Sequence, residues 1–337
     1  MADQIAPLPP METIPKLIWG VYSPMAFLAG CQLDVFSQFK DGPLSAEQVA
    51  EALGVGVIKL RQLLFALVST GLLTHSGGRF SNSPEANAYL VKGKLNYMGS
   101  RHELMSIGWD ALLKTANSIR TGTAQAKAAF DYSSTPSENL EKVFRGLHAG
   151  ALADGRMLAK RNEIISCHTL VDIGGGSGGL AIALAQNLPG LNVTILDLPA
   201  VTQITRRFVS EATMSDRIQV DTWDVVHEKL VGKYDAAVLR AVIHTLSVDD
   251  ARSVLLNIGR AINPGGWILI IGAVLDNSRL SPPTMVNNNL VFLNSYDGGQ
   301  AYTESEYREW LVEAGFRDFT REIQKEGHSL LIARMPS

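Results

Sequence analysis

Residues 170–199 read LVDIGGGSGGLAIALAQNLPGLNVTILDLP, and this stretch decides the fold. A short apolar run leads into a glycine-rich turn, an apolar helical segment follows, and a second apolar run ends at Asp197. This order is typical of a nucleotide-binding α/β unit, in which the backbone approaches the ligand at a helix N-terminus. An acidic residue about 20 positions after the glycines, here Asp197, can accept hydrogen bonds from ribose hydroxyls.

The glycines alone leave the identity of the ligand open. Gly174, Gly176 and Gly179 match G-x-G-x-x-G, while Gly174, Gly176 and Gly178 match G-x-G-x-G. Either match fits a dinucleotide, a phosphate or an adenosyl sulfonium. Asp172 favours the last of these, because a carboxylate placed before the first glycine suits a cationic amino-acid end better than a pyrophosphate.

Strand-like and helical segments alternate from residue 169 onward. The strand-like runs span residues 169–173, 192–198, 217–220, 235–240 and 267–275. Such alternation predicts parallel strands joined by crossover helices in a doubly wound sheet. Residues 318–335 contain two further runs around a Glu-Gly turn, which predicts a final antiparallel hairpin.

The third strand-like run ends in VDTWD, which adds a possible adenine site. Trp223 and Asp224 stand at the tip of this strand, where an indole ring suits the face of adenine and a carboxylate suits its edge. A Pro-Gly-Gly turn in INPGGWILII then precedes a strand that is apolar throughout. Both features favour an adenosyl ligand.

The N-terminal part of the chain reads as short helices followed by a hairpin. Ser45 can cap a helix with Gln48, Gly54 can end it, a second helix follows, and GLLTHSGGRFSNS at 71–83 predicts the hairpin. This winged-helix pattern often binds DNA, but two basic residues near the start of the second helix are too few for a phosphate-binding face. We interpret it as a scaffold or dimerisation module. Residues 97–165 are predicted to be helical, with a loop at 131–139.

Composition limits the class of protein. The chain has 337 residues, 46% of them hydrophobic and 19% charged, with a net charge of −3, which predicts a globular protein without a broad nucleic-acid-binding face. Cys31 and Cys167 are the two cysteines and lack metal-ligand spacing, so we expect no disulfide framework, no metal site and a reducing cytoplasm. No secretory signal or membrane span is predicted.

With these motifs in order, the chain resembles the class I S-adenosylmethionine-dependent methyltransferases, specifically the small-molecule O-methyltransferases of plant phenylpropanoid and bacterial polyketide pathways. The resemblance implies a homodimer built through a winged-helix-like domain at 1–95, a helical linker at 96–165 that contributes to the acceptor pocket, and a Rossmann-like catalytic domain at 166–337. VDIGGGSG, LDLP, DTWD and LRAVIHTL correspond to its motifs. The implied S-adenosylmethionine ligands are Asp172, Gly174, Gly176, Gly178, Asp197, Leu198, Trp223, Asp224 and Arg240.

The resemblance also implies that His244, in VIHTLSVDD, is the general base on a phenolic hydroxyl. The carboxylates that orient this histidine in the family fall on Gly272 and Ala301, and neither side chain can accept a hydrogen bond. A thioether sulfur attacks the methyl group directly and has no proton to lose. The departure therefore favours S-methylation of a thioether acid. The family branch that methylates 4-methylthio-2-hydroxybutyrate on the route to dimethylsulfoniopropionate is one such relative.

Two alternatives stay open at this point: O-methylation of a phenol or enol with His244 as base, and a winged-helix regulator that uses the Rossmann-like half as a ligand sensor. For the enzyme, pocket shape matters, because positioning in a dry pocket accelerates methyl transfer. Arg145 could anchor an acceptor carboxylate. The candidate acceptor-binding residues are Trp109, His148, Asn288, Tyr296, Arg145, His102 and Phe292, with Arg101, Met105 and Phe144 near them.

Overall fold

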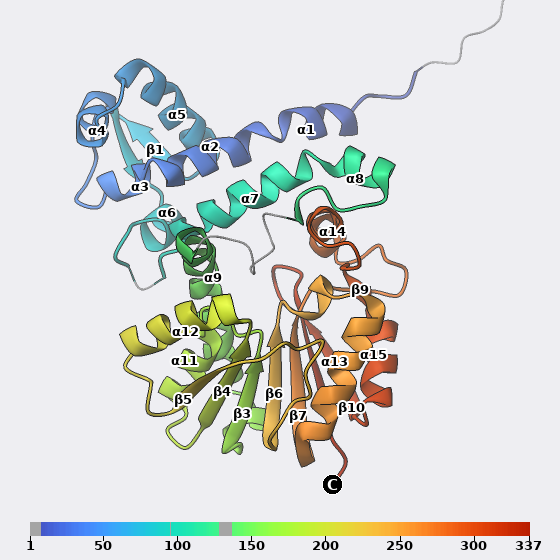
Figure 1. Ribbon diagram of the computed structural model, residues 1–337. Coiled ribbons are helices and arrows are strands. Elements are labelled where there is room, and N and C mark those ends of the chain that lie inside the picture. The colour runs from blue at the N-terminus through green and yellow to red at the C-terminus, as the bar shows by residue number, and fades with distance from the viewer. Residues whose placement is uncertain (1–7, 95, 128–136) are drawn as a thin grey trace, which may run out of the picture. The chain divides into compact units, whose positions relative to one another are not determined.

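The computed structural model describes residues 8–94, 96–127 and 137–337, so most of the loop expected at 131–139 lies outside the described residues (Figure 1). The chain divides into two compact units, residues 1–102 and 103–337. The first unit therefore extends beyond residue 95, and most of the segment 96–165 clusters with the second unit.

The first unit consists of helices and one small hairpin, as the sequence predicts. The helix α4 (Ala46–Leu53) begins at a capping box: the Ser45 hydroxyl accepts from the Gln48 N–H at 3.3 Å, and Gln48 Oε1 accepts from the Ser45 N–H at 2.9 Å. Gly54 ends this helix with a φ of 65°. The other elements are α1 Thr13–Trp19, α2 Tyr22–Gln32, α3 Val35–Gln38, α5 Val57–Ser69, β1 Leu73–Ser76, β2 Arg79–Asn82, α6 Pro84–Tyr89 and the 3₁₀ turn Gly99–Arg101.

Helices also precede the first strand of the second unit. Buried hydrogen bonds connect one of them, α8, to α14 (Pro283–Ser295). The Ser118 hydroxyl donates to Oδ1 of Asn294 at 2.6 Å, and the Asn294 amide donates to Thr115 Oγ1 at 2.9 Å and to the Leu290 carbonyl at 2.7 Å. Asn294 is 0% exposed, so this network holds α14 firmly in place. The helices are α7 His102–Leu112, α8 Thr115–Thr121, α9 Ser137–Leu158 and α10 Asn162–Ile165.

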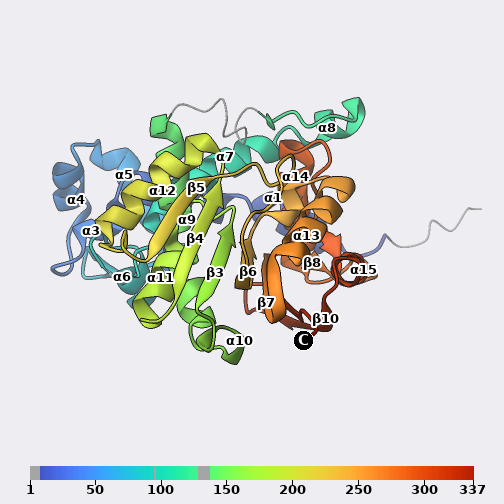
Figure 2. The same cartoon turned by 60° about the horizontal axis from the view of Figure 1, so that its bottom comes forward.

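Within the described residues, the second unit contains a seven-stranded sheet in the order β10-β11-β7-β6-β3-β4-β5 (Figure 1; Figure 2). The strands from β5 to β7 run parallel, and β11 and β10 add an antiparallel hairpin at one edge. The doubly wound sheet and its final hairpin are thus confirmed. The strands are β3 Thr169–Ile173, β4 Asn192–Asp197, β5 Ile218–Thr222, β6 Tyr234–Arg240, β7 Ile262–Gly272, β10 Arg317–Ile323 and β11 Ser329–Arg334.

Each face of the sheet carries its own core. The helices α9, α11 (Gly179–Asn187) and α12 (Pro199–Glu211) cover one face, and α13 (Val248–Ala261) and α15 (Glu304–Glu313) cover the other (Figure 2). Leu170 packs into the first core and its neighbour Val171 into the second. Since central strands are buried on both faces, their sequences are apolar runs without alternation.

A short parallel pair outside the main sheet joins the segments after β7 and before α15. The run 267–275, predicted as one strand, is interrupted at Ala273, and β8 (Val274–Leu275) then pairs with β9 (Tyr302–Thr303). The Tyr302 hydroxyl donates to the carbonyl of Leu246 at 2.6 Å. The pair therefore brings the ends of two distant segments close to the turn that follows β6.

Replacing Tyr307 of α15 by phenylalanine is expected to raise the free energy of unfolding by about 1 kcal/mol. Tyr307 is 0% exposed, and its hydroxyl has no hydrogen-bond partner among the described residues. The ring, 5.8 Å from that of Trp310, would stay in place. Urea unfolding measures the change. The matched control, Tyr302→Phe, should lower stability because its hydroxyl is bonded, and equal losses in both variants would contradict this account.

Candidate active site

The glycine turn after β3 is closed by hydrogen bonds to Asp197 at the end of β4. The N–H of Gly176 donates to Oδ2 of Asp197 at 2.7 Å, and the N–H of Leu198 donates to Oδ1 at 2.8 Å. Burial raises the pKa of Asp197 to about 6, although these two donors oppose the shift. Gly174, Gly176 and Gly178 have φ values of 65°, 57° and 70°, which other residues rarely adopt. The path of this turn therefore requires glycine.

Asp172 is a buried carboxylate beneath the turn. It is 0% exposed, and neither oxygen has a hydrogen-bond partner among the described residues. Burial and the nearby Asp197 raise its pKa to about 7, and Arg240 partly offsets the shift. A buried carboxylate without a partner is costly and marks a site that a cationic group would complete. The residues present thus fit the ammonium group and ribose of S-adenosylmethionine.

The tip of β5 carries the residues expected to meet adenine. Trp223 is 6% exposed, and its Nε1 has no hydrogen-bond partner in the described part of the chain. The carboxylate of Asp224 accepts from the N–H of Val226 at 3.0 Å and contacts Nδ1 of His227 at 2.8 Å. Burial alone would raise the pKa of Asp224, but these bonds lower it below its ordinary value. Asp224 is therefore held as a carboxylate at the end of the strand.

Arg240 ends β6 and is tied to α9. Its Nε donates to Oδ2 of Asp154 at 2.6 Å, and a Cβ atom on Gly150 would lie 3.0 Å from its guanidinium. Asp154 could not be predicted from the sequence, because a lone acidic residue in a helical segment gives no signal of its partner. The pair places a fixed positive charge near Asp172.

His244 lies in the 3₁₀ turn Ile243–Thr245 that follows β6. It is 8% exposed, and its ring stacks on that of Phe292 from α14, with centroids 4.1 Å apart and an interplanar angle of 15°. Burial lowers its pKa to about 3, and the positive charges of His328 and Arg240 add to this effect. His244 is therefore a neutral imidazole throughout the physiological pH range.

Of the two positions expected to lack carboxylates, Gly272 lies at this histidine and Ala301 packs with the ring that stacks on it. A Cβ atom on Gly272 would stand 3.5 Å from Nδ1 of His244, so Gly272 faces the imidazole directly. Ala301 is 0% exposed and packs in one cluster with Phe292, which itself stacks on His244. The backbone N–H of Ala301 donates to Oδ1 of Asn289 at 2.8 Å. The surroundings of the imidazole are thus apolar or basic.

The structure brings two of the acceptor-side candidates into direct contact with the motifs. Phe292 covers His244, and Nδ1 of His148 lies 2.9 Å from Oγ of Ser177 in the glycine turn. Ser177 was not predicted as a functional residue, although it lies inside residues 170–199, because its partner His148 is 29 positions away in the sequence. Arg145 binds Glu141 at 2.7 Å and lies over the Phe208 ring, on the side of α9 that faces α12.

The other acceptor-side candidates stay predictions. Trp109 lies in α7, Asn288 in α14, and Tyr296 directly follows α14. His102 is the last residue of the first unit, so its place relative to His244 is not defined.

A doubly wound sheet with a glycine-rich turn after its first strand and a histidine after its fourth is the arrangement expected of a methyltransferase. The chain belongs to the O-methyltransferase family: residues 109–317 match the O-methyltransferase domain, and residues 16–92 match the O-methyltransferase dimerisation domain. The family match confirms the expected enzyme class, a methyltransferase that uses S-adenosylmethionine.

Similar proteins cover almost the whole chain. A 3-hydroxy-5-methyl-1-naphthoate 3-O-methyltransferase from Streptomyces sahachiroi is 28% identical over 91% of this chain and 91% of its own length. The acetylserotonin O-methyltransferase of Bos taurus is 30% identical over 89% of this chain and 90% of its own. An O-methyltransferase family structure from Burkholderia thailandensis, 19% identical, has a TM-score of 0.84 over 98% of this chain and 99% of its own. The last of these shows the fold.

The described residues contain no group of three or more histidine, cysteine, aspartate or glutamate side chains that could hold a metal ion. No single helix in the described ranges has the length and apolar composition needed to cross a membrane, and only a pair bent by 114°, α4 with α5, meets the criterion jointly.

Proposed function

We propose that this methyltransferase acts on the sulfur of a small thioether acid, such as 4-methylthio-2-hydroxybutyrate, without a general base. The observation that carries the proposal is the environment of His244: Gly272, which has no carboxylate, faces Nδ1 of the imidazole, and the pKa of His244 is lowered to about 3. An imidazole with so low a pKa is a poor proton acceptor at neutral pH.

One group of residues in the site would bind the cofactor, and another would orient the acceptor. When bound, S-adenosylmethionine supplies a methyl group activated by its sulfonium. Asp172 would hold the ammonium group, Asp197 the ribose hydroxyls, and Asp224 the adenine edge. A thioether sulfur uses its own lone pair and releases no proton, so His244 and Phe292 need only shape a dry wall that orients the acceptor.

The charges near His244 support an acidic acceptor. The groups that lower its pKa electrostatically are His328 and Arg240, and both are basic. Arg240 carries a permanent positive charge and is paired with the carboxylate of Asp154. A positive potential favours an acceptor that carries a carboxylate.

O-methylation is the second candidate function. It is favoured by a specific observation: His244 is neutral and buried next to Gly272, so it offers a free lone pair. The relatives from Streptomyces sahachiroi and Bos taurus are named as O-methyltransferases. The winged-helix regulator receives no support, because both family models that match the chain describe O-methyltransferases.

We also propose that the protein works as a cytoplasmic homodimer joined through the first unit, without nucleic acid or membrane as partner. Residues 16–92 match a dimerisation domain. The helices α1 and α2 and the turn between them expose large apolar side chains that a second copy would cover, namely Ile14, Leu17, Ile18, Trp19, Val21 and Tyr22. Both cysteines are free and buried, which suits a reducing compartment.

Replacing His244 by glutamine tests the choice of acceptor atom. With a thioether acceptor, turnover should fall less than about tenfold, because no proton is transferred. With a hydroxyl acceptor, loss of the base should cost roughly 10²–10⁴-fold. Mass spectrometry of products from labelled cofactor and a panel of phenols, enols, thiols and thioether acids measures both.

Two controls accompany this experiment. His168→Gln changes an exposed histidine and should leave turnover unchanged. The second control is the pH profile of the unaltered enzyme: the pKa of about 3 keeps His244 neutral between pH 6 and 9, so turnover should not depend on its titration in this range with either acceptor. The identity of the product therefore decides, and methylated phenol as the product would refute the proposed acceptor.

A further inference from the structure

The helix α9 packs closely on the glycine turn. A Cβ atom on Gly176 would lie 2.8 Å from the ring of Phe144, and one on Gly179 would lie 3.0 Å from Ala151 and from His148. One turn further along, Asp154 binds Arg240. Helix α9 therefore contacts the turn, the start of α11 and the end of β6 in succession.

His148 makes the polar contact in this interface. Its Nδ1 lies 2.9 Å from Oγ of Ser177, which is 2% exposed, and the same Oγ accepts from the N–H of Gly179 at 3.4 Å. Burial lowers the pKa of His148 to about 4, and the charge of Arg145 adds to the shift. The neutral imidazole can then accept the Ser177 proton at Nδ1.

The ring of His148 is also held from its other side. It lies against the ring of Phe208 from α12, with centroids 4.6 Å apart at an angle of 42°. The imidazole is thus wedged between α12 and the glycine turn, and its Nδ1 stays directed at Ser177. Buried hydrogen bonds of this kind fix one orientation of the groups that they join.

We propose that His148 is a positioning residue for the cofactor turn: through Ser177 it fixes the path from Gly176 to the first turn of α11. Ser177 bonds to both His148 and the Gly179 N–H, so its hydroxyl couples the turn to α9. Loss of the imidazole leaves this buried hydroxyl without an acceptor and frees the turn to move. The inference rests on binding of S-adenosylmethionine by this turn and is independent of the acceptor.

The test uses calorimetry with S-adenosylhomocysteine on the full chain. His148→Phe keeps a ring against Phe208 but removes the acceptor, and should weaken binding by about five- to tenfold, the worth of one hydrogen bond. His148→Asn places an amide oxygen near the position of Nδ1 and should restore most of the affinity. The KM for cofactor should rise in His148→Phe while kcat at saturation changes little.

A double-mutant cycle guards against misfolding and packing effects. Ser177→Ala, a small change, should weaken binding as much as His148→Phe, and the double variant should be no weaker than either single one. His168→Phe, at an exposed histidine, is the matched control. Additive losses, or an asparagine variant as weak as the phenylalanine variant, would overturn the proposal.

The same experiment separates this inference from the proposed function. Unaltered protein that binds S-adenosylhomocysteine, together with an unaffected His148→Phe variant, overturns the role of His148 alone. Unaltered protein that fails to bind S-adenosylhomocysteine overturns both.

Discussion

Asp172→Asn is expected to stabilise the ligand-free protein at neutral pH and to abolish tight cofactor binding. The pKa of Asp172 is about 7 in the folded protein, against an ordinary value of 3.8. A raised pKa means that the folded state prefers the protonated carboxyl, so its contribution to stability is full below about pH 4 and is lost as the pH rises through 7. Ionisation then costs on the order of 4 kcal/mol, and asparagine avoids it.

Thermal unfolding of the ligand-free proteins between pH 5 and 8 measures the first effect, and the advantage of the variant should grow with pH. Calorimetry with S-adenosylhomocysteine measures the second, and affinity should fall at least 100-fold because a buried charge partner is removed. Asp216→Asn, at an exposed aspartate, should change neither property. A stability difference independent of pH, or unchanged affinity, would show that Asp172 is not an unpaired carboxylate awaiting a cation.

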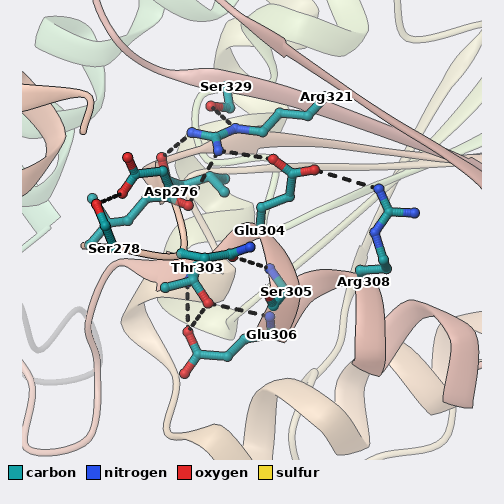
Figure 3. A network of polar contacts seen from close by, with 12 residues as sticks. Asp276, Ser278, Thr303, Glu304, Ser305, Glu306, Arg308, Arg321 and Ser329 are labelled. Atoms are coloured by element: carbon teal, nitrogen blue, oxygen red, sulfur yellow. Dashed lines mark hydrogen bonds and ion pairs between the residues drawn. The ribbon is translucent and has the colours of Figure 1, made fainter. Parts of the chain in front are cut away.

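Arg321→Met should lower the free energy of unfolding by about 3–5 kcal/mol, as the loss of a buried charge with several partners does. The Arg321 side chain is 6% exposed. Its guanidinium donates to the carbonyls of Val274 and Leu275 at 2.7 and 3.3 Å, to Glu304 at 3.2 Å and to Ser329 at 3.1 Å (Figure 3). Methionine fills similar space but leaves these acceptors unpaired.

The neighbouring Arg308 provides a matched control for this prediction. It contacts the same Glu304 from the other side at 3.5 Å, and its side chain is 53% exposed (Figure 3). Exposed pairs contribute little, so Arg308→Met should cost less than about 1 kcal/mol. Urea unfolding compares the two variants. If both variants lost a similar amount of free energy of unfolding, the buried hydrogen bonds of Arg321 in Figure 3 would not be what stabilises β8.

The main sheet could be predicted from the sequence because its signals are local. The central parallel strands are mostly apolar runs, and the turn at Gly174 and the cap at Ser45 are set by residues within a few positions. The β8–β9 pair could not be predicted, since two-residue strands carry no periodicity and their pairing depends on contacts such as Tyr302 with Leu246.

Some features of the candidate site could likewise be predicted from the sequence, and others could not. The expectation that Gly272 and Ala301 replace the carboxylates beside His244 came from the resemblance to the family, and the structure places Gly272 at the imidazole. The bonds of Arg240 to Asp154 and of His148 to Ser177 join residues far apart in sequence. Two residues so far apart in the sequence form no local pattern, so the sequence does not show that they are hydrogen-bond partners.

The hairpin that completes the sheet has a further consequence for behaviour at high concentration. Strand β10 is an open edge, where unpaired N–H and C=O groups invite a strand from another molecule. Its pairing is irregular between Arg317 and Thr320, Asp318 has a φ of 54°, and Glu322 is held by Arg161. A bulged and charged edge is a poor template for added strands. Polymerisation of molecules into fibrils through the β10 edge is therefore disfavoured.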